Sequence, residues 1–170
     1  NDVEEFFLKN GEEDPLHREI LEEHARSPLF QGKLEKFSHA GIWQSEKTGN
    51  TCKVELVRSE STIEKIRFSG QGSALSQACA SLMCSQLNGM DVLESSHLCR
   101  DILQYVELGK EFTPPGDLIV YQTIFDFLTD IADSVYAMEN GSIHFDQQLH
   151  VHQHVHAHPH GAYTHKQTDP

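Results

Sequence analysis

The stretch Ile66–Met83, IRFSGQGSALSQACASLM, decides the fold. It begins with a strand-like segment, continues through two glycines at Gly70 and Gly72, and ends in a run of small residues after Ser73. Glycine lets the backbone turn sharply and pass close to other atoms, and serine is a preferred helix N-cap. The sequence therefore predicts a strand–turn–helix corner in which Ser73 caps the helix and faces solvent. Such a corner is suited to presenting a metal ligand or a nucleophile.

The residues before this corner predict a small antiparallel sheet. In its middle strand Cys52 and Val54 alternate with Lys53 and Glu55, which is the period of a strand with one buried and one polar face. Turns are predicted around residues 48–50 and 59–61. The three expected strands are His39–Gln44, with Trp43 as its apolar anchor, a strand beginning near Cys52, and Ile63–Phe68.

Helices are predicted on both sides of the sheet sequence. A first helix begins at Asp14 and Pro15 and continues to about Arg26. The expected later helices are one after Ser73 that stops at Gly89, one that begins with the Asp91 and Glu94 capping pair, and one over about Leu118–Met138. The fold class is then α+β, a three-stranded antiparallel sheet with helices packed on one face. We expect an N-terminal arm over residues 1–13, a domain over 14–141 and a tail over 142–170.

Composition limits the classes of function. The chain has 170 residues and a formal net charge of −13, and an acidic chain lacks the basic footprint of a nucleic-acid partner. No apolar run approaches the ~20 residues of a membrane span, and no secretory signal is visible, so we expect no membrane association. The sequence begins with Asn, which leaves the true N-terminus open. The four cysteines form no C-x-x-C pair, which favours a reduced, cytoplasmic protein.

The tail is rich in histidine. In an extended chain, alternate side chains lie on one side about 6.5–7 Å apart, so two or three imidazoles can reach one zinc, nickel or copper ion. Low-complexity drift and an expression remnant are the alternative explanations. The alternating residues are His150, His152, His154, His156, His158 and His160.

Three other cysteines and Ser73 have simpler interpretations. Cys79 falls on the apolar face of its helix, and Cys99 lies beside an apolar residue, so both are expected to pack in the core. Cys84 falls on the polar face with Ser81, which leaves an accessible thiol and a packing role both open. Ser73 has no histidine or aspartate at a recognisable spacing, which disfavours a hydrolase.

Four matches in order resemble the U-type iron–sulfur cluster assembly scaffolds, the family of IscU and the NifU N-terminal domain. They are the helix segment LHREILEEHARSP at residues 16–28, Gly32-Lys33-Leu34, the turn Gly49-Asn50-Thr51-Cys52, and the opening corner with its helix ending at Leu87-Asn88-Gly89. The resemblance covers about residues 14–138.

The resemblance implies a scaffold rather than an enzyme. Such proteins receive sulfur from a cysteine desulfurase, bind iron, build a [2Fe–2S] cluster and pass it to chaperone or acceptor proteins; some hold zinc in the same pocket. Cys52 stands at the first ligand position, as sulfur acceptor or sole thiolate. Val54 replaces the family's aspartate, Ser73 replaces its second cysteine, and no cysteine follows Cys99. Because a cluster normally takes four protein ligands, the resemblance predicts an impaired or relocated cluster site.

Two other functions remain open on the sequence. One is a metal-binding protein that stores, delivers or senses zinc, nickel or iron through the histidine tail. The other is an adaptor without metal whose helical face contacts a desulfurase or chaperone. Whether a partner supplies missing ligands in trans is also open.

Overall fold

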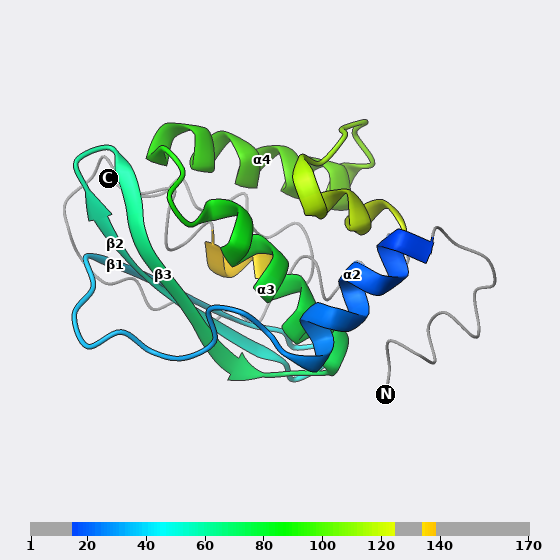
Figure 1. The fold of residues 1–170 in the computed structure, drawn as a ribbon, viewed down its shortest axis with the longest axis horizontal. Helices are drawn as coiled ribbons and strands as arrows, with labels where there is room; N and C mark the ends of the chain where they lie inside the picture. The colour runs from blue at the N-terminus through cyan, green and yellow to red at the C-terminus, as the bar shows by residue number, and fades with distance from the viewer. Residues whose placement is uncertain (1–14, 125–133, 139–170) are drawn as a thin grey trace.

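The structure is a computed structural model that describes residues 15–124 and 134–138 (Figure 1). The named elements of this part follow in the order helix, three strands, two helices and a 3-10 helix. Their bounds are α2 Pro15–Arg26, β1 His39–Gln44, β2 Thr51–Ser59, β3 Thr62–Gln71, α3 Ala74–Leu87, α4 Val92–Leu108 and η1 Gly116–Gln122. Residues 134–138 are also helical.

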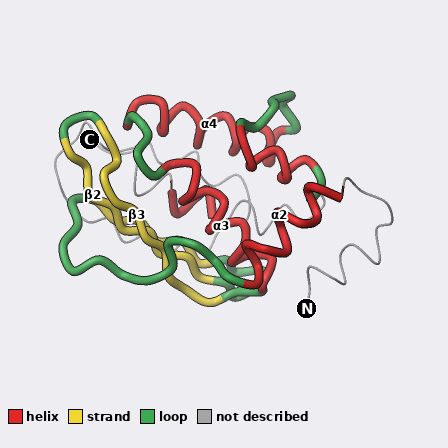
Figure 2. Tube along the Cα trace, in the orientation of Figure 1, coloured by secondary structure: helices red, strands yellow, loops and turns green. Residues whose placement is uncertain are grey.

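The three strands form one antiparallel sheet in the order β1-β2-β3. Figure 2 shows the helices gathered on one side of these strands. The register sets Cys52 in β2 opposite Trp43 in β1 and opposite Gly70 in β3. The predicted α+β fold with helices on one face of the sheet is therefore confirmed, and β1 has the predicted bounds.

Helix α3 is the centre of the core. Its buried residues face in several directions, because β3, α2 and η1 all pack against it. The side chains of Ser81 and Cys84 both have 0% exposure, so the predicted polar face is wrong. Helical periodicity could not show this, because the second buried face is created by α2, which lies far from α3 in the sequence.

A buried histidine joins α2 to α3. His24 Nδ1 lies 2.7 Å from Ser81 Oγ, and the backbone N–H of Leu29 donates to the same oxygen at 2.8 Å. The Ser81 hydroxyl can accept from Leu29 and still either donate to or accept from His24 Nδ1, so the direction of the second bond depends on the imidazole tautomer. Burial lowers the pKa of His24, although the nearby carboxylates of Asp117 and Glu23 act in the opposite direction.

Residues 29–38, which we call the strap, run from the edge of β3 to the start of β1. Gly32 N donates to Phe68 O at 2.8 Å, and Ser38 N donates to Leu56 O at 2.9 Å. Beneath the strap, the Glu55 carboxylate accepts from Leu34 N at 2.9 Å and pairs with Lys53 Nζ at 3.3 Å. Glu55 is therefore buried, and its predicted place on a solvent-facing side of the sheet is wrong.

Two predicted elements have different bounds. Strand β3 extends past Phe68 to Gln71, so Gly70 belongs to the strand and not to the turn. The predicted helix over Leu118–Met138 is wrong at its start, where η1 is a 3-10 helix. Its Tyr121 hydroxyl donates to the buried Cys79 carbonyl at 2.8 Å, a tertiary contact that helical periodicity does not reveal.

Some predictions concern residues outside the described part of the chain. These are the arm over residues 1–13, the Asp14 cap, the middle of the expected last helix and its end, and the histidine tail over residues 142–170. Among the described helices, none is long and apolar enough to cross a membrane.

Candidate functional site

The strand–turn–helix corner positions the site. Ser73 has an extended backbone and is the N-cap of α3, as predicted, with its side chain accepting from Ser76 N at 3.1 Å. Its side chain is exposed and does not line the neighbouring cavity. The hydroxyl of Ser73 is therefore committed to the helix end, where an N-cap typically contributes about 1 kcal/mol.

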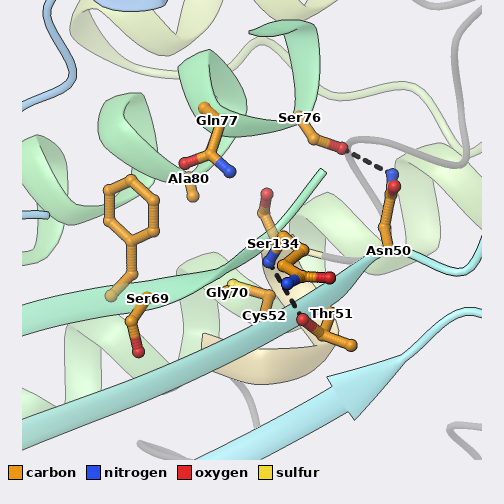
Figure 3. A pocket seen from close by; sticks show the side chains of 11 residues that line it. Asn50, Thr51, Cys52, Ser69, Gly70, Ser76, Gln77, Ala80 and Ser134 are labelled. Atoms are coloured by element: carbon orange, nitrogen blue, oxygen red, sulfur yellow. Dashed lines mark hydrogen bonds between the residues drawn. The ribbon is translucent and has the colours of Figure 1, made fainter. Parts of the chain in front are cut away.

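A small cavity lies between this corner, β2 and the first turns of α3 (Figure 3). It contains Cys52, whose side chain is 7% exposed. The centre of a water-sized group can occupy about 20 Å³ there, and one water needs at least ~10–15 Å³ by this measure. The cavity therefore has room for a group of about one heavy atom. Its lining is Asn50, Thr51, Cys52, Phe68, Ser69, Gly70, Gln71, Ser76, Gln77, Ala80 and Ser134.

Glycine brings the walls of the cavity together. Gly70 has a φ of +146°, and a Cβ there would overlap the carbonyl oxygen of Thr51 on the adjacent strand. A Cβ on Gly72 would lie 3.0 Å from Ser76 Cβ and 3.3 Å from Asn50 Cγ. These close approaches explain physically why the corner contains two glycines.

Two hydrogen bonds connect the walls (Figure 3). Asn50 Nδ2 donates to Ser76 Oγ at 2.9 Å, which joins the loop before β2 to the first turn of α3. Gln71 N donates to Thr51 Oγ1 at 3.0 Å, which joins the end of β3 to the start of β2.

The cavity is polar but carries no carboxylate, imidazole or cationic side chain among its described lining residues. All four cysteines are buried free thiols. For Cys84 the structure supports the packing alternative, because burial raises the pKa of its thiol well above the ordinary value, with the neighbouring Cys52 adding to the shift. Cys84 is therefore a poor candidate for a reactive thiolate.

The described residues do not fit a cluster or a four-ligand zinc ion. Cys52 is the single thiol of the cavity lining, and residues 15–124 and 134–138 contain no group of three or more His, Cys, Asp and Glu side chains able to hold a metal. Val54 has 0% exposure and belongs to the apolar core. The six tail histidines predicted as ligands lie outside the described part. Iron and zinc favour thiolate, imidazole and carboxylate ligands, and neutral hydroxyls are poor substitutes.

Sequence reasoning found Cys52 but missed three of its neighbours. Asn50 lies in the predicted turn before Cys52, and a polar side chain two residues before the candidate thiol is a usable signal. Ser76 lies in the first turn of α3, where the run of small residues after Ser73 does not distinguish it from its neighbours. Ser134 lies far along the chain, and no sequence signal connects it to Cys52.

The chain matches the family model described as the NifU-like N terminal domain over residues 16–121. It is 27% identical over 112 residues to the zinc-dependent sulfurtransferase SufU of Bacillus subtilis. The aligned region covers 64% of this chain and 73% of that protein. A Fervidobacterium islandicum protein described as an iron–sulfur cluster assembly scaffold for the SUF system has a TM-score of 0.65 at 20% identity, covering 72% of this chain and 93% of its own. A NifU-like N-terminal structure from Brucella abortus has a TM-score of 0.61 at 19% identity, covering 71% and 85%. At these identities the two structures establish a shared fold.

Proposed function

The chain belongs to the NifU-like N-terminal domain family of scaffold-like iron–sulfur cluster assembly proteins, and on that premise we propose that it is an accessory scaffold that receives sulfur on Cys52. It does not build a complete cluster from its own pocket residues. The observation that carries this proposal is the cavity itself, which offers one thiol and room for about one heavy atom.

The proposed chemistry is a transfer of sulfane sulfur. The Cys52 thiolate attacks the outer sulfur of a donor persulfide, a new S–S bond forms on Cys52, and the donor leaves as its own thiolate. The Cys52 thiol proton passes to solvent or to the departing thiolate, so no external oxidant or reductant is needed. The product, a persulfide on Cys52, adds one sulfur atom to the side chain, which matches the size of the cavity.

We propose that this transfer is stoichiometric, so that the chain acts as a carrier and not as a turnover enzyme. The relative SufU is named a sulfurtransferase, which makes repeated transfer to a small thiol the competing outcome. The proposed donor is a cysteine desulfurase, and the proposed recipients are iron–sulfur chaperone or acceptor proteins. We place the activity in the cytoplasm, in keeping with the thiol state of all four cysteines.

The test combines the full chain with a cysteine desulfurase, cysteine and ferrous iron. We expect mass spectrometry to find one additional sulfur on the Cys52 peptide, and we expect no visible absorption from a cluster on the isolated chain. Cys52→Ser removes the acceptor, and Cys99→Ser is the matched control because Cys99 is buried away from the cavity lining. A chain that never gains sulfur on Cys52 contradicts the carrier function, and a stable cluster on the isolated chain contradicts the accessory role.

A second candidate function is metal binding by the tail, which the six alternating histidines favour. We propose that neutral imidazoles of this segment bind zinc or nickel, and that binding weakens below about pH 6.5 as they become protonated. Calorimetric titration of the full chain against a full-length variant with all six residues changed to Gln tests it. Equal metal stoichiometry in both proteins rules the tail out as the metal site.

A further inference from the structure

We propose that Asn50 and Ser76 form a latch that closes the cavity over Cys52 and restricts it to groups of about one heavy atom. The inference goes beyond the proposed sulfur carrier, because it names the residues that control what reaches the thiol. The relevance of the latch to sulfur rests on the proposed function, whereas its effect on access to Cys52 does not.

The latch joins two segments that are far apart in the sequence. Asn50 belongs to the connection between β1 and β2, and Ser76 belongs to the first turn of α3. The 2.9 Å hydrogen bond from Asn50 Nδ2 to Ser76 Oγ spans the space between them (Figure 3). Both residues line the cavity that contains Cys52.

Gly72 makes this closure possible. A side chain at this position would press against both partners, at 3.0 Å from Ser76 Cβ and 3.3 Å from Asn50 Cγ. Both distances are tighter than nine in ten real Cβ contacts, so a methyl group there requires Asn50 and Ser76 to shift by a few tenths of an ångström. Unlike Gly70, Gly72 has no left-handed φ, so alanine at this position acts on the contact and not on the backbone conformation.

The closed state is selective because it is small. Cys52 is 7% exposed, and the free space beside it accommodates about one water-sized group. A terminal persulfide sulfur fits this space, whereas two irons and two sulfides do not. A donor thiol group must therefore approach while the latch is open, and the single sulfur that it leaves behind is enclosed when the latch closes.

One hydrogen bond gives the latch a modest strength. The net contribution of an ordinary intramolecular hydrogen bond corresponds to about a fivefold change in an equilibrium constant. Removal of the bond is therefore expected to raise the open population, and with it the reaction rate of Cys52, by about fivefold.

The experiment measures alkylation of Cys52 in the folded full chain, with iodoacetamide as a small reagent and a bulky maleimide as a large one. Peptide mass spectrometry follows each cysteine separately. We expect Asn50→Ala, Ser76→Ala and Gly72→Ala each to raise the Cys52 rate about fivefold, with a larger gain for the maleimide. The buried Cys79 and Cys84 report general unfolding, and their rates should not change.

Two comparisons separate a latch from a loss of stability. The control Lys110→Ala removes a different side-chain hydrogen bond, the 3.1 Å bond from Lys110 to Gln104, and neither of these residues lines the cavity. It should leave the Cys52 rate unchanged. In the double variant Asn50→Ala/Ser76→Ala the gain in rate should be smaller than the product of the two single gains, because the bond between the two side chains is lost only once. Additive effects, equal gains at all cysteines, or unchanged Cys52 rates would each overturn the latch.

A second measurement, loading with a small-molecule persulfide, distinguishes failure of the latch from failure of the proposed sulfur-carrier function. Small-molecule persulfide is added to wild type and to Asn50→Ala, and sulfur on Cys52 is measured together with its rate of loss to a thiol. We expect faster loading and faster loss in the variant. If the variants change the alkylation rate of Cys52 but Cys52 never gains sulfur, the latch is supported and the sulfur-carrier function is contradicted. If Cys52 gains sulfur but no variant changes its alkylation rate, the sulfur-carrier function is supported and the latch is contradicted.

Discussion

Replacement of Gly70 by alanine is expected to destabilise the protein more than any other single methyl addition in the corner. The new Cβ would overlap the carbonyl oxygen of Thr51, and it would lie 2.8 Å from that carbonyl carbon and 3.1 Å from Cys52 Cα. These are backbone atoms of the paired strand β2, so no side-chain rotation can relieve the contact. The φ of +146° is also rarely adopted by residues with a side chain. Backbone strain of about 1–3 kcal/mol and overpacking of about 1–3 kcal/mol together predict a loss of roughly 2–6 kcal/mol.

Urea unfolding followed by circular dichroism measures this loss as a lower midpoint. Gly49→Ala is the matched control, because Gly49 also has a positive φ, +80°, but nothing lies within 4 Å of its added Cβ. The control should lose about 1–2 kcal/mol from backbone strain alone. Equal losses in the two variants would refute the argument, since the steric overlap with β2 would then contribute nothing.

Three further changes test the contacts around the core. Burial lowers the pKa of His24 below its usual 6.5. The contribution of neutral His24 to stability is therefore complete above pH 6.5 and is lost as the pH falls through the folded-state pKa. In urea titrations between pH 7.5 and 5.5, the free energy of unfolding should fall more steeply for wild type than for His24→Gln, by up to about 1.4 kcal/mol per pH unit. Glu55→Ala leaves a strap N–H without its acceptor and should lower the free energy of unfolding by about 1–3 kcal/mol, against less than about 0.5 kcal/mol for the exposed Glu64→Ala. Tyr121→Phe removes the donor to the buried Cys79 carbonyl and should lower that free energy by about 1–3 kcal/mol, and an unchanged thermal midpoint would contradict the contact.

The sequence correctly predicted features that depend on residues close together in the chain, namely the helix caps, one strand and one turn. Ser73 and Asp91 are the N-caps that their residue types indicate, with side chains that accept from the first-turn N–H groups. Strand β1 has the predicted bounds, and the turn at residues 59–61 contains Glu60 with a φ of +56°. Each of these features depends on residues within a few positions of one another.

The wrong predictions involve partners distant in sequence. The position of Glu55 depends on the strap, whose Leu34 lies outside the strand pattern. The burial of Ser81 depends on His24 and Leu29, which approach from α2 and the strap. The 3-10 helix η1 packs Tyr121 against α3 where helical periodicity predicted a longer α-helix. Periodicity reports which residues are apolar, but it does not report which second element covers the other face.

The positions that the resemblance assigned to metal ligands now contribute to the fold instead. Val54 is fully buried in the core, where an apolar side chain of its size contributes about 1.5–3 kcal/mol, and a carboxylate at the same place would need a charged partner that the described core does not provide. Ser73 caps α3 and does not line the cavity. A cysteine at position 73 would therefore weaken the cap. The described lining therefore offers one thiol, and neither Val54 nor Ser73 adds a ligand to it.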